Sequence, residues 1–135
     1  MIQLIIGAKG SGKTKKIIDQ ANDSLANVKG DVVFISNKSK YSQEINYKIR
    51  FVTAEEFSIE SGEALIGFVR GLIAGNSDIE AVYIDGIARI VGKRAKESEE
   101  IYKALESISS KRGTDFVITV SEESTDIPDF MAIYR

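Results

Sequence analysis

Apolar residues along this chain of 135 residues fall into short runs that alternate with amphipathic stretches. Several runs are apolar on both faces, which is typical of strands buried centrally in a parallel sheet. These runs cover residues 2–6, 31–36, 79–85 and 115–120. Residues 48–52 alternate between apolar and charged side chains, which predicts an edge or half-covered strand. Residues 130–134 are predicted to form a short final strand.

Between these runs, apolar residues recur at helical spacing. Residues 17–25 predict a first helix that ends near Asn27. The strongest periodic run spans residues 64–73 and forms one broad apolar stripe, and a third covers residues 101–108. Strands that alternate with helices predict a single α/β domain over residues 1–135, with a mostly parallel sheet of five or six strands and helices on both faces.

Two connections carry local signals. Residues 53–56 read Thr-Ala-Glu-Glu and match a capping box, so a helix is expected to begin there and Glu56 is interpreted as structural. Residues 37–47 are polar and lack clear periodicity, which predicts a loop or a short helix.

The connection after the first strand has a fixed pattern of glycines followed by lysine and threonine. It fits G-x-x-x-x-G-K-[ST], a phosphate-binding loop whose backbone N–H groups, together with the positive end of the next helix, face the same anion. We expect Lys13 to reach the β- and γ-phosphates and Thr14 to offer its hydroxyl to Mg²⁺. The candidate phosphate-binding residues are Gly7, Ala8, Lys9, Gly10, Ser11, Gly12, Lys13 and Thr14. The alternative is a glycine-rich hinge that binds nothing.

A second part of the site is expected where the strand over residues 79–85 ends in a carboxylate. Magnesium-nucleotide sites place an Asp at the end of a hydrophobic strand. Asp85 is therefore expected to hold the ion through its water shell, while Thr14 coordinates it directly. Lys13 and Asp85 are the principal candidates for a catalytic role. Many parallel strands end in Asp, so this interpretation depends on the loop.

Composition narrows the classes of function. The net charge is −2 and the sequence pI is near 5.3, so a broad basic surface for nucleic acid is not indicated. The chain has no cysteine and no histidine, which leaves carboxylates, lysine, serine and threonine for any chemistry. The apolar runs are too short to span a membrane, so no membrane association is expected and the cytoplasm is the expected location.

The two motifs together resemble a known superfamily. Residues 7–14 and 81–85 resemble the Walker A and Walker B elements of P-loop NTPases, as does the order of strands and helices over most of the chain. The length and three local runs also resemble small clostridial ATP-binding proteins sometimes labelled twitching-motility proteins. Those runs are residues 7–16, 67–76 and 116–128. Class II thymidine kinases are a more distant likeness. The resemblance implies ATP, or another NTP, and Mg²⁺ as cofactors.

The resemblance also identifies a departure. Many ATPases of the RecA-like branch place a Glu directly after the Walker B Asp, where it polarises the attacking water, but this chain has Gly86 there. Glu55, Glu122 and Glu123 lie near predicted strand ends and are substitute candidates for a base. The alternative for each is a solvated or capping residue. Without a positioned base, hydrolysis is expected to be slow.

Thr119 and Ser121 are further candidates because they end the strand over residues 115–120. In RecA-like proteins a polar residue there senses the γ-phosphate. The alternative is a hydroxyl that is tied into the turn over residues 121–125. Four cations in the connection over residues 87–96 are interpreted as a lid, an arginine finger, a patch for an anionic partner, or a solvated surface. They are Arg89, Lys93, Arg94 and Lys96.

The RecA-like strand order is preferred, with the strand over residues 115–120 between those over residues 2–6 and 79–85. The kinase or GTPase order would pair the latter two directly. We expect a small Mg-ATP-binding protein with weak NTPase activity. Two alternatives remain: a non-catalytic, nucleotide-dependent switch or adaptor for a protein partner or a second copy of the chain, and a small-molecule kinase that acts on nucleosides.

Overall fold

The computed structural model describes residues 1–123 and 125–135 and contains one sheet of five parallel strands. The four runs that are apolar on both faces became strands, because such runs gain most when both faces of the sheet are covered. The strands are β1 (Ile2–Gly7), β2 (Asp31–Ser36), β3 (Arg50–Thr53), β4 (Ile79–Asp85) and β5 (Asp115–Ser121). The predicted α/β class with a parallel sheet is confirmed.

The strand order is β1-β5-β4-β2-β3, so β5 lies between β1 and β4. In the register, Ile5 lies beside Thr119 and Ile84 lies beside Ile118. The predicted RecA-like order is therefore confirmed. The kinase or GTPase order is wrong for this chain, because β1 and β4 are not neighbours.

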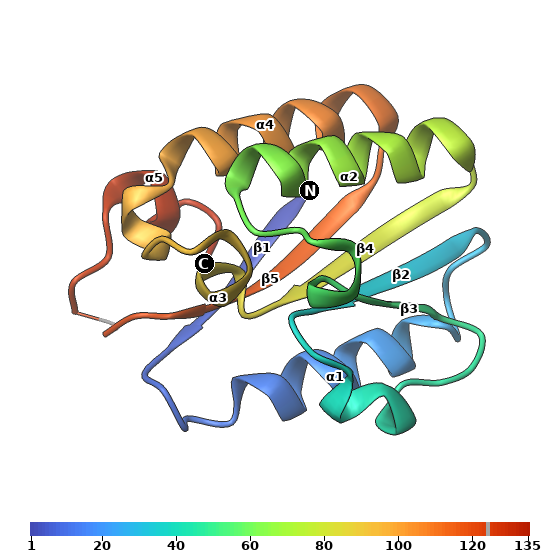
Figure 1. Cartoon of the computed structure of the whole chain (residues 1–135), viewed down its shortest axis with the longest axis horizontal. Helices are drawn as coiled ribbons and strands as arrows, with labels where there is room; N and C mark the ends of the chain where they lie inside the picture. Colours follow the sequence, from blue (N-terminus) through green and yellow to red (C-terminus); the bar gives the residue numbers. More distant parts are fainter. Residues whose placement is uncertain (124) are drawn as a thin grey trace.

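Helices cover both faces of the sheet. Figure 1 shows α2 (Gly62–Gly75) and α4 (Glu99–Arg112) side by side over one face and α1 (Lys13–Ser24) on the other. The shorter helices are α3 (Ile87–Val91), α5 (Asp129–Ala132) and the 3₁₀ turns η1 (Ser39–Glu44), η2 (Glu55–Phe57) and η3 (Ala95–Glu97). None of the helices described here is long and apolar enough to cross a bilayer.

The core has two layers, and strand alternation assigns side chains to one or the other. Ala81 and Tyr83 pack with Ile17 of α1 in the smaller cluster. Val82 and Ile84 pack with the buried stripes of α2 and α4 in the larger one. Within one strand, the face that an end residue occupies therefore follows from that of the residue two positions before it.

The predicted final strand over residues 130–134 is wrong, because this segment contains α5 (Asp129–Ala132). Its apolar side chains pack at helical spacing: Met131 is fully buried, and the ring of Phe130 lies 5.8 Å from that of Tyr102 on α4. The segment makes one backbone hydrogen bond to the edge of β1, from Leu4 N–H to the Tyr134 carbonyl at 2.8 Å. A ladder needs several such bonds, so helix packing determines the conformation.

Two predicted helix boundaries also need correction. No capping box forms over residues 53–56: η2 has no side-chain cap, and α2 begins only at Gly62, where Ser61 Oγ accepts from Ala64 N–H at 3.1 Å. Thr53 ends β3 and pairs with Ser36, and the residue that directly precedes η2 is Ala54, which has no side-chain oxygen to accept from the first N–H groups. The first helix ends at Ser24 rather than near Asn27.

Candidate functional site

The loop between β1 and α1 leaves helix N–H groups open to an anion. Gly12 directly precedes α1 with φ 87° and ψ 17°, a left-handed conformation that glycine adopts at little cost. No side chain caps this end, and the first turn holds no acidic residue. Because the first N–H groups of a helix lack partners within the helix, the loop presents them together with the positive end of the helix dipole.

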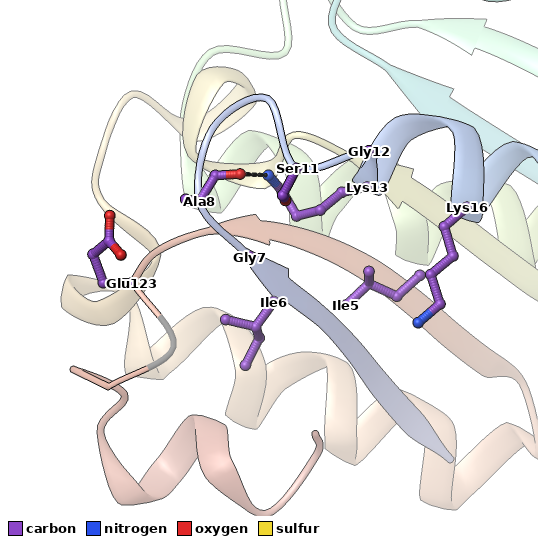
Figure 2. Close-up of a pocket in the computed structure, with 9 residues that line it drawn as sticks. All are labelled: Ile5, Ile6, Gly7, Ala8, Ser11, Gly12, Lys13, Lys16 and Glu123. Atoms are coloured by element: carbon purple, nitrogen blue, oxygen red, sulfur yellow. Dashed lines mark hydrogen bonds between the residues drawn. The ribbon is translucent and has the colours of Figure 1, made fainter.

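A hollow of about 350 Å³ lies against this loop (Figure 2). Its lining comes from the end of β1, the loop, the start of α1 and Glu123, which follows β5. Lys13 bends back over the loop, and its Nζ donates to the Ala8 carbonyl at 3.0 Å, as Figure 2 shows. This bond holds the ammonium beside the hollow.

Lys13 lies among charges of both signs. Burial lowers the pKa of Lys13 below its ordinary value, the carboxylate of Asp85 opposes that shift, and the guanidinium of Arg89 adds to it. Lys13 and Arg89 therefore repel each other, and an anion bound between them would relieve that repulsion.

Asp85 and Thr14 meet although they are 71 positions apart in the sequence. The Thr14 hydroxyl lies 3.2 Å from Oδ2 and 3.4 Å from Oδ1 of Asp85. Asp85 shares a face of the sheet with Tyr83, and that face packs on α1. One hydroxyl and one carboxylate are hard oxygen ligands of the type that Mg²⁺ prefers, so the pair could hold this ion together with water and phosphate oxygens.

Thr119 completes this group from β5. Its hydroxyl donates to Asp85 Oδ1 at 2.7 Å and accepts from the Gly86 N–H at 2.7 Å. Thr119 is therefore bonded to Asp85 and to Gly86; the predicted turn over residues 121–125 includes residue 124, which lies outside the described residues. The alternation that places Val117 on the α1 face predicts that Thr119 shares this face, but the sequence alone does not say that β5 is next to β4.

Gly86 directly precedes α3 with φ 77° and ψ 54°. A glutamate at this position would have to adopt the left-handed region, which costs about 1–2 kcal/mol for a residue with a β-carbon. The absence of a carboxylate after Asp85 is therefore consistent with the backbone, since glycine permits the turn from β4 into α3.

The substitute bases lie in different environments. Glu122 is buried, and its Oε1 accepts from the Arg94 guanidinium at 2.9 Å. Glu55 begins η2 next to the edge strand β3 and is exposed. Glu123 is exposed and lines the hollow, and Ser121 is exposed at the end of β5, beside Gly7. Of the three substitute bases, Glu123 lies near the loop with its side chain exposed, as does Ser121, a candidate γ-phosphate sensor.

The four cations of the connection separate into two pairs. Arg94 and Lys96 bind acidic residues of the segment after β5: Arg94 pairs with Glu122, and Lys96 Nζ lies 2.5 Å from Asp126 Oδ2. Arg89 lies near Lys13, and Lys93 is exposed. No sequence signal indicates the Arg94–Glu122 pair, because 28 positions and α4 separate the two residues.

Comparison with known proteins gives the class of fold. No protein-family model matches the sequence, and no curated protein matches it. The structure is similar to that of the flagellar accessory protein FlaH from Methanocaldococcus jannaschii, with a TM-score of 0.61 and 12% identity over 98% of this chain. The match covers 65% of the FlaH chain. This likeness shows the fold, which is a P-loop NTPase-like α/β fold with an all-parallel sheet of five strands.

Proposed function

We propose that this protein binds a magnesium nucleotide, ATP or another NTP, at the loop over residues 7–14. The observation that carries the proposal is the meeting of Thr14 Oγ1 and Asp85 Oδ2 at 3.2 Å beside an uncapped helix that follows a glycine-rich loop. The open N–H groups are suited to phosphate oxygens, and the hydroxyl and the carboxylate are suited to the metal ion that accompanies a phosphate chain.

Each residue has a distinct part in this proposal. The N–H groups of the loop and of the first turn of α1 bind phosphate oxygens, and Lys13 leaves the Ala8 carbonyl to neutralise the β- and γ-phosphates. Thr14 and Asp85 would hold Mg²⁺, Asp85 through water. When bound, the ion neutralises charge on the phosphates and so favours transfer of the terminal phosphoryl group.

Hydrolysis is expected to be slow. No carboxylate follows Asp85, and Glu122 is occupied by Arg94. Water orientation would then depend on exposed groups such as Glu123, which ordinary side-chain motion moves in and out of position. The proposed activity is accordingly nucleotide binding with weak NTPase turnover.

Calorimetry against ATP, ADP, GTP and GDP, with Mg²⁺ and with EDTA, tests this proposal. Wild-type protein should bind at least one nucleoside triphosphate in a magnesium-dependent way. Lys13→Ala should weaken this binding by at least about 30-fold, because removing one partner of a charge pair costs about 2 kcal/mol or more. Lys15→Ala is the matched control: Lys15 is exposed, pairs with Asp19 at 2.8 Å and should leave affinity unchanged. Equal affinity of wild type and Lys13→Ala would refute the proposal.

A second role, as a nucleotide-dependent switch, is favoured by one observation. The Glu122 N–H donates to the Gly7 carbonyl at 3.2 Å, and the Glu122 side chain binds Arg94. The start of the loop is therefore connected, through one residue, to the segment over residues 92–98. Hydrogen exchange over residues 87–98, with and without a non-hydrolysable ATP analogue, tests this role. Unchanged exchange in protein saturated with nucleotide would count against a switch.

A further inference from the structure

The Thr119 hydroxyl makes hydrogen bonds to two successive residues, Asp85 at the end of β4 and Gly86 directly after it. A hydroxyl has one proton, and that of Thr119 is donated to Asp85 Oδ1 at 2.7 Å. The same oxygen accepts from the Gly86 N–H at 2.7 Å. Thr119 is only 1% exposed, so water competes little for either bond.

These bonds divide the two oxygens of Asp85 between different tasks. Oδ1 receives the short bond from Thr119, whereas Oδ2 is the oxygen nearer to Thr14, at 3.2 Å against 3.4 Å for Oδ1. A carboxylate with one oxygen held cannot rotate freely about its χ angles. The oxygen that faces the proposed metal position is therefore oriented before any ion arrives.

We propose that Thr119 is a positioning residue that orients the Asp85 carboxylate for Mg²⁺ and does not itself contact the nucleotide. This inference rests on the proposed nucleotide site. It differs from the sensor role that a polar residue at this strand end has in RecA-like proteins, because the only proton of Thr119 is already committed to Asp85. To contact a terminal phosphate, Thr119 would have to release Asp85.

The bond to Gly86 extends the effect to the backbone. Gly86 is the residue where β4 turns into α3, the short helix that contains Arg89. Thr119 thus fixes both the side chain of Asp85 and the direction in which the chain leaves β4. Groups that hold a metal-binding carboxylate in this manner commonly contribute about 10- to 100-fold to metal affinity.

The test compares Mg²⁺-dependent and Mg²⁺-free ATP affinity in Thr119→Val, which keeps the shape and removes the hydroxyl. The ratio of the two affinities, here called the magnesium increment, should fall about tenfold, while affinity in EDTA stays within about twofold of wild type. Thr119→Ser keeps the hydroxyl and should preserve the increment. Thr114→Val is the matched control, since Thr114 is equally buried, lies next to the start of β5 and bonds the Ile79 carbonyl at 3.2 Å, away from the site.

A double variant separates positioning from direct contact. If Thr119 acts through Asp85, adding Thr119→Val to Asp85→Asn should not lower the magnesium increment any further. A further loss in the double variant, or loss of affinity in EDTA, would instead assign Thr119 to the nucleotide and overturn the inference. Should Thr119→Val fail to fold, the comparison of Thr119→Ser with Thr119→Ala isolates the same hydroxyl.

The outcomes also separate this inference from the function on which it rests. If the wild-type protein binds no nucleotide, the proposed function fails and the role of Thr119 in it fails as well. If the wild type binds Mg-ATP and Thr119→Val retains the full magnesium increment, only the inference is overturned.

Discussion

Two acidic residues stand at the ends of neighbouring strands, and their surroundings differ. Asp85 ends β4 on the face that packs on α1, and its bonding partners are the hydroxyls of Thr14 and Thr119. Glu122 directly follows β5, is buried, and its partner is the guanidinium of Arg94. Burial raises the pKa of the Tyr102 phenol on α4, and the nearby charge of Glu122 raises it further. Glu122 therefore faces α4.

The difference shows how a sheet assigns roles to similar side chains. Alternation places Asp85 with Tyr83 on the α1 face, and it places Glu122 with Val120 on the face covered by α2 and α4. Hydroxyl partners orient a carboxylate but leave its charge, which a metal ion can then neutralise. A guanidinium neutralises the charge itself, so Glu122 is suited to holding two segments together.

The largest expected effect comes from removing each charge in turn. Asp85→Asn should lower the magnesium increment of ATP binding by about 10- to 100-fold, because it removes a charged ligand of the ion's water shell. Glu122→Gln should change this increment by less than about twofold, since its side chain lies on the other face. Titration of both variants with ATP in Mg²⁺ and in EDTA measures the contrast. Similar losses in the two variants would show that the two carboxylates do not have separate roles.

The free energy of unfolding, unlike the magnesium increment, should depend on the ion pair of Glu122. Arg94→Ala leaves Glu122 buried without its partner and should reduce the free energy of unfolding by about 1–3 kcal/mol, less than for a fully buried pair because Arg94 is 59% exposed. Adding Glu122→Gln should recover part of the loss. Lys103→Ala, which breaks an exposed pair with Glu99, is the control and should cost less than about 0.5 kcal/mol. Urea denaturation gives the values, and an additive double variant would contradict the pairing.

A smaller effect is expected from the backbone that follows Asp85. Gly86→Ala should cost about 1–2 kcal/mol, because alanine is strained at φ 77°. It should also weaken magnesium-dependent binding, because the Thr119 hydroxyl that accepts from the Gly86 N–H is the one that donates to Asp85. Gly113→Ala has a similar φ of 71° at the end of α4 and should cost similar stability with no change in binding. Equal binding losses in the two variants would indicate general destabilisation.

The smallest effect concerns pH. The pKa of Lys13 is lowered in the folded protein, so between that value and 10.5 the unfolded chain binds the proton that the folded chain has released. The free energy of unfolding should therefore increase slightly as pH rises through this window. ATP affinity should fall over the same window, because Lys13 loses its positive charge. Lys13→Ala should remove both trends. Unfolding and binding measured from pH 8 to pH 10.5 in wild type and Lys13→Ala test this.

The prediction of the fold succeeded where the signal was local. Runs such as residues 79–85 identify strands because burial on both faces demands continuous apolar sequence. It failed at residues 130–134, where a short apolar segment fits a strand or a helix equally well and packing against α4 determined the outcome. The capping pattern at residues 53–56 also failed, because the short turn there is preceded by Ala54 and the long helix α2 begins only at Gly62, capped by Ser61.

In the candidate site, too, the local motif could be predicted from the sequence and the contacts between distant residues could not. Residues 7–14 can be recognised from sequence because glycine, lysine and threonine at fixed spacing act within one turn of chain. Asp85 could be proposed as their companion. The bond from Thr119 to Asp85 and the bond from Arg94 to Glu122 could not be predicted from the sequence, because 34 and 28 positions separate the two residues of each pair.

By itself, the sequence determined that this protein has a glycine-rich phosphate-loop motif between a buried strand and an amphipathic helix, since those features depend on neighbouring residues. Only the tertiary structure decided what surrounds the acidic strand ends. Placing β5 between β1 and β4 brings Thr119 to Asp85, and alternation along β5 then turns Glu122 to the opposite face, toward Arg94. Strand order is a property of the whole packed sheet, so no local pattern could have specified these contacts.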